Sequence, residues 1–233
     1  MNLARAFGHE LGSSPMSLAT PARPIVFVVD DDVSVRESLE LLIHSAGWQP
    51  ETFESAREFL ARPPALVPNC LVLDISLPGL NGLELQKRIA ADRTDMPIIF
   101  VTGYGDVPTT VKAMKAGAVE FLTKPFSDEV LLSAIRQALE RSRIALDQET
   151  EVRAIRNCYA SLTPREREVM ALVVSGLLNK QVGGELGISE ITVKAHRGKV
   201  MQKMKANSLA DLVKISAKLR FARTGGPETP PTS

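Results

Sequence analysis

Short segments that suit β-strands alternate with amphipathic helical segments along the first half of the chain. Strands are predicted at 25–29, 49–53, 70–73, 97–101 and 119–122. Helices are predicted at 33–46, in a short segment that begins with the capping box Ser55–Glu58, and at 83–91 and 107–116. Because strands and helices alternate, we predict an α/β fold with a five-stranded, doubly wound parallel sheet.

The pattern becomes entirely helical from residue 127 onward. Ser127 can cap a helix that starts at Asp128, and apolar residues then recur at helical spacing with no Pro or Gly before Cys158. We therefore predict one long helix, which follows the first domain (24–126) and continues through 127–159 as a linker. The helix either pairs with a copy of itself or stays monomeric, and its few heptads leave both alternatives open.

A second, all-α domain is predicted over 160–220. Its first helix has a strong start, since Thr163–Glu166 form a capping box with Pro164 at the first helical position. Helices are expected at 164–175, 179–186, 190–204 and 208–219. A short helix, a Gly turn and a basic helix in succession are typical of a helix-turn-helix. In the basic helix we expect Ile191, Val200 and Met204 to pack inward.

Both ends of the chain have compositions typical of disorder. Residues 1–23 have no hydrophobic periodicity, and residues 221–233 are rich in Pro, Gly and Thr. We therefore expect a disordered N-terminal lead and a disordered C-terminal tail. Met16 stands shortly before the first strand, and we hypothesise that translation starts there, so that residues 1–15 are an over-extended reading frame.

Charge is divided unequally between the two predicted domains. Residues 24–126 carry 9 Lys/Arg and 14 Asp/Glu, whereas residues 160–220 carry 11 Lys/Arg and 5 Asp/Glu. The difference either reflects chance variation in surface composition or indicates different partners, with a polyanion for the basic domain. The chain contains no apolar run long enough to span a membrane and no signal-peptide pattern. Two widely spaced cysteines suit a reducing compartment, so we expect a cytoplasmic protein.

Polar residues stand at the ends of four predicted strands. Asp30 and Asp31 follow the first strand and Asp74 the third, while Thr102 and Lys124 follow the fourth and fifth. Because the carboxyl ends of parallel strands meet at one edge of a sheet, these groups should lie together. Neighbouring carboxylates repel, and Mg²⁺, which prefers carboxylate oxygens and water, relieves that repulsion. Asp74 could then attack a phosphoryl group, with Lys124 stabilising the charge on the transferred oxygens.

Each of these residues has an ordinary structural explanation when it is taken alone. An acid after a strand is commonly a helix cap, and a lone Lys commonly lies on the surface. A second reading uses Asp30 as a nucleophile and Asp32 as an acid–base group, because Asp30-x-Asp32 resembles the first motif of haloacid-dehalogenase-type phosphatases. The further acidic pair and the cap domain of that family are not evident in the sequence, and we expect that the protein is not an enzyme.

Four motifs resemble the signature set of the two-component receiver domain, which has a flavodoxin-like fold. They are Val28-Val-Asp-Asp-Asp32, Leu73-Asp-Ile-Ser-Leu-Pro-Gly79, Val101-Thr-Gly103 and Phe121-Leu-Thr-Lys-Pro-Phe126. The resemblance implies that Asp74 accepts a phosphoryl group from a sensor histidine kinase.

The resemblance also assigns roles to the residues around Asp74. The implied Mg²⁺ ligands are Asp30, Asp31, Asp74 and the Ile75 carbonyl. Thr102 and Phe121 match a coupled switch pair, and Lys124 matches the phosphate-binding Lys that precedes a cis proline. Ser76 and Tyr104 match positions where the family tunes the lifetime of the acyl phosphate, and a bulky Tyr104 predicts slow autodephosphorylation.

The predicted helix at 190–204 is basic. Its donors are Lys194, His196, Arg197, Lys199 and Lys203. A capped basic helix can enter the major groove of DNA with its N-terminal half on base edges. A solvated surface is the alternative explanation for such a helix.

The second domain resembles the LuxR-type DNA-binding domain. The matching segments are Leu162-Thr-Pro-Arg-Glu-Arg-Glu168, Gly176, Asn179-Lys180, Gly187-Ile-Ser189 and Thr192-Val-Lys-Ala-His196. Beside a receiver, this domain resembles the NarL/FixJ class of response regulators. The resemblance implies that Lys194 and Ala195 face base edges, and that Gly198 stands where other members have a longer contacting side chain. The other implied DNA-binding residues, most of them on phosphates, are Lys180, Thr192, His196, Arg197 and Lys199.

Together the resemblances imply a phosphorylation-dependent transcription regulator. Phosphorylation of Asp74 would move Thr102 and turn Phe121 inward, which changes the outer face around the fourth helix and fifth strand. A homodimer formed there would place two recognition helices on promoter DNA, and the last helix could add a dimer contact. The expected partners are the kinase, promoter DNA, a second copy and RNA polymerase, with no membrane. The contrasting hypothesis is a passive dimer scaffold whose DNA binding is independent of phosphate.

Overall fold

The computed structural model describes residues 23–92, 96–103 and 107–224 of the chain. The chain forms two compact units that meet between Leu139 and Glu140, within one continuous helix. Met16 and most of the predicted lead and tail lie outside the described residues. The last helix continues to Thr224, so the first four residues of the predicted tail are helical.

The first unit is built around a parallel sheet. Its strands are β1 (Ile25–Val29), β2 (Gln49–Phe53), β3 (Asn69–Asp74), β4 (Ile98–Thr102) and β5 (Glu120–Thr123). Every pair is parallel, and the spatial order is β2-β1-β3-β4-β5. Val29 at the end of β1 is paired with Leu73, the residue before Asp74 in β3. This confirms the doubly wound sheet and places the ends of β1 and β3 next to each other.

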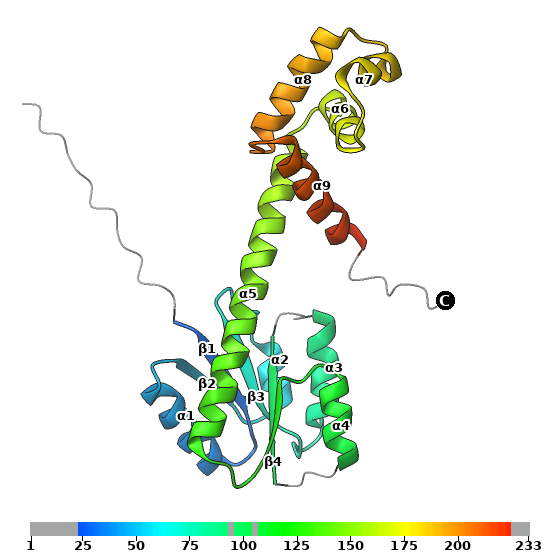
Figure 1. The fold of residues 1–233 in the computed structure, drawn as a ribbon. Helices are drawn as coiled ribbons and strands as arrows, with labels where there is room; N and C mark the ends of the chain where they lie inside the picture. The colour runs from blue at the N-terminus through cyan, green and yellow to red at the C-terminus, as the bar shows by residue number, and fades with distance from the viewer. Residues whose placement is uncertain (1–22, 93–95, 104–106, 225–233) are drawn as a thin grey trace, which may run out of the picture. The chain divides into compact units, whose positions relative to one another are not determined.

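Helices cover both faces of this sheet (Figure 1). They are α1 (Val33–Ser45), α2 (Ala56–Ala61), α3 (Gly82–Asp92), α4 (Val107–Lys115) and α5 (Asp128–Ala160). Successive side chains of a strand point to opposite faces, so Phe27 enters the core beneath α2, α3 and α4, whereas Val28 enters the core beneath α1 and α5. Burial on both faces explains why β1, β3 and β4 are apolar almost throughout.

Helix α5 is the long helix that the sequence predicts. Ser127 caps it, since the Val130 N–H donates to the Ser127 Oγ at 3.4 Å. Its first turns bury Leu131 and Ile135 against the sheet. Its last turns contribute partly buried Ile155 and Tyr159 to the core of the second unit. The same helix therefore supplies apolar side chains to two separate cores.

The second unit is all-helical in its described part after α5. Its helices are α6 (Pro164–Val174), α7 (Asn179–Leu186), α8 (Glu190–Lys203) and α9 (Leu209–Thr224). The capping box at the start of α6 is confirmed: Thr163 Oγ1 accepts from the Glu166 N–H at 3.3 Å, and Glu166 Oε2 accepts from the Thr163 N–H at 2.9 Å. Helix α7 ends at Gly187, whose left-handed φ of 65° favours glycine.

One sequence-based expectation about side chains is wrong, and another holds only in part. Ile191 does not pack inward: its side chain is 82% exposed, and Val193 takes the core position instead. Ile191 and Val193 lie two residues apart, so they point to nearly opposite sides of the helix and only one can be buried. The capping box at Ser55 is confirmed in one half only: Ser55 Oγ accepts from the Glu58 N–H at 3.2 Å, but the Glu58 carboxylate accepts from the Glu54 N–H rather than from that of Ser55.

Cys70 and Cys158 are free thiols, and Cys70 is buried in the sheet. Burial raises the pKa of the Cys70 thiol, which keeps it protonated and unreactive. Among the described helices, none is long and apolar enough to cross a membrane.

The packing of the first unit can be tested at the aromatic cluster of Phe27, Phe53 and Phe59. Phe59 is fully buried, and its ring lies 5.5 Å from the rings of Phe27 and Phe53, between centroids. Phe59→Ala should lower the free energy of unfolding of this unit by about 3–5 kcal/mol, because it removes the ring and leaves a cavity. Urea denaturation followed by circular dichroism measures the change. Leu66→Ala is the control, since Leu66 is 87% exposed and its loss should change stability by less than about 0.5 kcal/mol.

Candidate functional site

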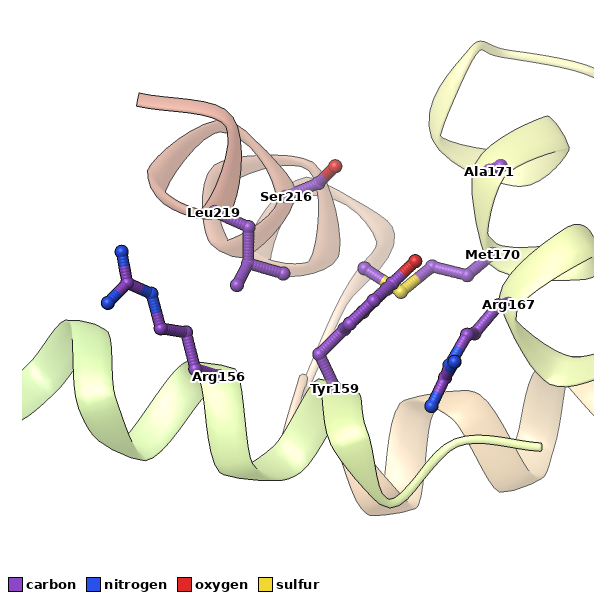
Figure 2. Close-up of a pocket in the computed structure, with 7 residues that line it drawn as sticks. All are labelled: Arg156, Tyr159, Arg167, Met170, Ala171, Ser216 and Leu219. Atoms are coloured by element: carbon purple, nitrogen blue, oxygen red, sulfur yellow. The ribbon is translucent and has the colours of Figure 1, made fainter. Parts of the chain in front are cut away.

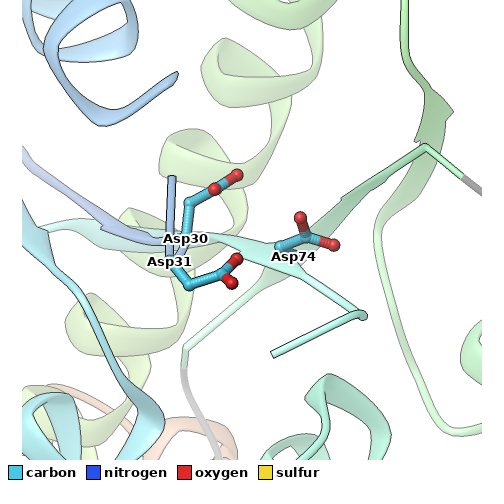
Figure 3. Close-up of side chains that lie close together, drawn as sticks. All are labelled: Asp30, Asp31 and Asp74. Carbon is cyan, nitrogen blue, oxygen red and sulfur yellow. The ribbon is translucent and has the colours of Figure 1, made fainter. Parts of the chain in front are cut away.

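Three carboxylates meet at the carboxyl edge of the sheet. Asp30 and Asp31 follow β1, Asp74 ends β3, and one oxygen from each lies within 4.8 Å of the others (Figure 3). Asp30 and Asp74 are nearly buried, whereas Asp31 is exposed. The neighbouring positions of β1 and β3 in the sheet create this cluster from residues that are 43 and 44 positions apart in sequence.

Lys124 balances the charge of this cluster. Its Nζ donates to Asp30 Oδ2 at 2.8 Å and to Asp74 Oδ2 at 3.1 Å. Partial burial alone would lower the pKa of Lys124, but the hydrogen bonds and charges of Asp30 and Asp74 outweigh it and raise that pKa. Lys124 is therefore held as a cation between two nearly buried carboxylates, and it precedes the cis peptide bond to Pro125 that the sequence predicts.

Backbone groups orient the two buried acids. Asp30 Oδ1 accepts from the Asp32 N–H at 3.0 Å. In addition, the Arg36 side chain holds the Asp30 backbone, since its guanidinium donates to the Asp30 carbonyl at 2.7 Å. Asp74 Oδ1 accepts from the Ser76 N–H at 2.9 Å. Asp32 instead caps α1 by accepting from the Ser34 N–H at 2.8 Å, so it serves the helix rather than the cluster.

Gly82 is a residue of this site that sequence reasoning missed. It begins α3, and a Cβ at this position would lie 2.6 Å from the Asp74 carbonyl oxygen and 3.0 Å from the Ile75 Cα. The Gly82 N–H also donates to the Ile75 carbonyl at 3.1 Å. The Asn81-Gly82 pair signals only a turn in the sequence, and the close approach to Asp74 is visible only in the fold.

The two expected switch residues lie on adjacent strands. Thr102 ends β4 and is fully buried, and its carbonyl accepts from the Lys124 N–H at 2.8 Å. Phe121 in β5 is partly buried, with its ring centroid 6.3 Å from that of Phe100. Tyr104 lies outside the described residues, whereas Ser76 contacts Asp74 as noted above. The expected phosphate-binding and switch groups therefore all lie at β4 and β5, within two strands of Asp74.

The expected DNA-binding residues lie on α7 and α8. Five of them are exposed: Lys180, Thr192, Lys194, Ala195 and Lys199. Arg197 is partly buried and donates to Asn179 Oδ1 at 3.1 Å, which joins α8 to the start of α7. His196 is also partly buried, and its Nδ1 is enclosed with no hydrogen-bond partner among the described residues.

An ion pair helps to hold α8 in place. Lys203 at the end of α8 donates to Glu166 Oε2 at 2.7 Å, and Glu166 is only 3% exposed. Hydrogen bonds from Lys203 and from the Thr163 backbone, together with the Lys203 charge, lower the pKa of Glu166 from its ordinary 4.5 to about 2. Because Val193 and Val200 are buried on the same side, the opposite side of α8 is left exposed.

A small cavity lies where the end of α5 meets α6 and α9 (Figure 2). Its lining residues are Arg156, Tyr159, Arg167, Met170, Ala171, Ser216 and Leu219. The Arg167 guanidinium stacks on the Tyr159 ring at 5.3 Å and donates to the Ala160 carbonyl at 3.1 Å. These contacts anchor the end of α5 to α6.

Both units match known protein families. Residues 26–136 match the family Response regulator receiver domain, and residues 160–216 match the family Bacterial regulatory proteins, luxR family. Nodulation protein W of Bradyrhizobium diazoefficiens is 51% identical over 197 residues, covering 84% of this chain and 87% of that protein. Transcriptional regulatory protein FixJ of the same species is 44% identical over 191 residues, covering 82% of this chain and 93% of that protein. The chain is a response regulator of the NarL/FixJ class.

Solved structures agree with this assignment. The structure of response regulator StyR is 48% identical, with a TM-score of 0.77, and covers 84% of this chain and 100% of its own. The structure of full-length FixJ from B. japonicum is 42% identical, with a TM-score of 0.51. The match covers 87% of this chain and 99% of the FixJ chain. A receiver domain implies a histidine kinase as partner, and a LuxR-type domain implies DNA binding. The regulator is therefore a phosphorylation-dependent transcription factor.

The acidic cluster of the regulator fits Mg²⁺, the ion that receiver domains generally bind. Its donors are hard carboxylate oxygens, and exposed Asp31 leaves room for water ligands. Asp30, Asp31, Asp74 and the Ile75 carbonyl would hold the ion. When bound, Mg²⁺ would neutralise negative charge on the incoming phosphoryl oxygens.

The Glu166–Lys203 pair predicts how the LuxR-type domain responds to acid. Because the pKa of Glu166 is lower in the folded state, the pair stabilises the domain above the unfolded value of 4.5, and this stabilisation is lost as the pH falls towards about 2. The melting temperature of the parent domain should therefore fall more steeply between about pH 5 and pH 2.5 than that of Glu166→Gln. Calorimetry on the full chain measures this. Glu168→Gln, on the same helix but exposed, is the matched control and should keep the parent's slope. Parallel curves for parent and Glu166→Gln would contradict the prediction.

Proposed function

We propose that the regulator receives a phosphoryl group on Asp74 from a sensor histidine kinase, with Mg²⁺, and then dimerises on promoter DNA. The observation that carries the proposal is the position of Asp74: its carboxylate is next to Asp30 and Asp31 and 3.1 Å from the Lys124 ammonium. An acceptor needs a nucleophilic carboxylate, groups that hold a divalent ion and a fixed cation, and all three are present there.

In the proposed reaction a carboxylate oxygen of Asp74 attacks the phosphorus of the kinase phosphohistidine. The new P–O bond forms as the P–N bond breaks, and the imidazole of the kinase leaves. Lys124 exchanges its contact with Asp74 for the phosphoryl oxygens while keeping its bond to Asp30. The Thr102 hydroxyl then donates to a phosphoryl oxygen. Thr102 is close enough to take part because the Lys124 N–H donates to its carbonyl at the end of β4. Phe121 turns inward into the space that Thr102 leaves.

The proposed readout is a change at the outer face of α4 and β5, where a second copy of the regulator binds. Two copies would place two α8 helices on successive half-sites of a promoter, about one DNA turn apart. The bound dimer would then contact RNA polymerase in the cytoplasm.

The proposal treats the regulator as a switch and not as an enzyme. In the phosphatase alternative Asp32 would be the acid–base group, but Asp32 is engaged as the cap of α1. In the passive-scaffold alternative the acceptor residues would have no role. Their hydrogen-bonded arrangement around Lys124 favours the switch.

Asp74→Asn tests the acceptor. The variant should lose Mg²⁺-dependent labelling by acetyl phosphate, because an amide is not nucleophilic enough to form the acyl phosphate. Intact mass measures the labelling, light scattering the dimerisation, and fluorescence anisotropy the DNA binding. Asp32→Asn is the control: Asn caps a helix as well as Asp, so labelling and dimerisation should persist. An Asp74→Asn protein whose DNA binding still responded to acetyl phosphate would refute the switch.

Lys194→Ala tests the reading helix. Loss of an exposed Lys directed at base edges should weaken binding to a selected operator by about 1–3 kcal/mol, while binding to random duplex falls less. Arg57→Ala removes the same charge from an exposed position on α2 of the receiver and should leave both affinities unchanged. The two affinities are measured at one fixed salt concentration. Equal specific affinity of Lys194→Ala and the parent would show that α8 is not the reading element.

A further inference from the structure

Ile191 occupies an unusual position on α8. It stands in the first turn of the helix and is 82% exposed, whereas Val193 is fully buried. A single exposed aliphatic side chain has no special meaning on an ordinary surface. This one, however, belongs to the half of the helix that a helix-turn-helix domain directs at base edges.

The helical repeat places Ile191 in line with Ala195 and Gly198, on the side opposite Val193 and Val200. A Cβ at Gly198 would meet nothing within 4 Å, so the fold itself does not require a glycine there. Ala195 and Gly198 project little from the helix. The face can therefore approach a groove closely, and Ile191 is its bulky apolar group.

The surroundings of this face suit DNA. Lys194 and Lys199 are exposed on either side of it, so Lys194 can reach base edges while the positive charge of Lys199 is placed against phosphates. Ser189 caps the helix, since its Oγ accepts from the Thr192 N–H at 3.1 Å, and this fixes the first turn that carries Ile191. A β-branched side chain in a helix has one strongly preferred rotamer, so Ile191 loses little freedom on contact.

We propose that Ile191 recognises one thymine in each half-site by packing against its 5-methyl group. In the major groove only thymine presents a methyl group, and apolar side chains contact it there. The contact requires no hydrogen bond, so it adds a preference for a T·A pair beside the contacts of Lys194. The proposal rests on DNA binding by α8 as proposed above.

Deoxyuridine, which lacks only the 5-methyl group, provides the test. The full chain, treated with acetyl phosphate and Mg²⁺, selects its operator from a library of random duplexes. Each thymine of that operator is then replaced in turn by deoxyuridine, and Kd is measured by anisotropy. At one thymine per half-site the parent should lose about fourfold in affinity, the value of one buried methyl group. Ile191→Ala removes the contact from both half-sites, so its affinity for the thymine duplex should fall by about 16-fold, and a deoxyuridine at either position should lower it no further.

Salt dependence separates this role from a phosphate contact. Ile191→Ala should keep the parent's slope of log affinity against log salt, whereas Lys199→Ala should reduce the slope by about two, because the dimer loses one phosphate contact in each half-site. Leu41→Ala, a 74% exposed leucine on α1 of the receiver, is the matched control and should bind both duplexes as the parent does.

Two results would overturn the proposal: an Ile191→Ala protein with parental affinity, or a deoxyuridine penalty that persists in Ile191→Ala. A parent that binds the selected operator no better than random duplex would instead overturn specific DNA binding itself, and the thymine contact with it. The affinity of the parent for the selected operator, compared with its affinity for random duplex, therefore distinguishes failure of the thymine contact from failure of specific DNA binding.

Discussion

The ammonium group of Lys124 lies 2.8 Å from Asp30 and 3.1 Å from Asp74, and the receiver site depends on this arrangement. Two nearly buried carboxylates on neighbouring strands repel each other and have lost most of their water, so they need a cation between them. Lys124 supplies it from β5, on the far side of β4 from β3. Under the proposed reaction, a phosphoryl group on Asp74 would compete for the same ammonium.

Direct contacts connect that change with the rest of the unit. The Lys124 N–H is bonded to the Thr102 carbonyl, and Phe121, three residues before Lys124, packs near Phe100. Lys124 therefore connects the ends of β4 and β5 to Asp74 directly, through its backbone N–H and its ammonium group. Gly82 closes the other side, where α3 approaches the Asp74 backbone so closely that no side chain fits. Asp74 therefore lies between the Lys124 ammonium on one side and the backbone of α3 at Gly82 on the other.

In the DNA-binding unit, helix α8 has one side buried in the core and the other side exposed. Val193 and Val200 fix the rotation of α8, and the Lys203–Glu166 pair fixes its end against α6. The hydrogen bonds from Lys203 and the Thr163 N–H lower the pKa of Glu166 and so favour its charged form. With the buried side determined, the basic residues and Ile191 are left outward. Helix α5 contributes apolar residues to this core and, in its first turns, to that of the receiver.

The sequence by itself determined the order of strands and helices, the capping of α6 and the convergence of Asp30, Asp74 and Lys124, because period, caps and strand ends are local signals read in a known topology. Only the tertiary structure decided which apolar residue of α8 enters the core. Ile191 and Val193 are equally hydrophobic in the pattern, and the choice depends on how α8 is rotated against α6 and α7. The tertiary structure also revealed why residue 82 is a glycine. A Cβ there would clash with the backbone oxygen of Asp74, which is eight residues away in sequence. Local pattern specifies elements, whereas contacts between elements specify which side of each is used.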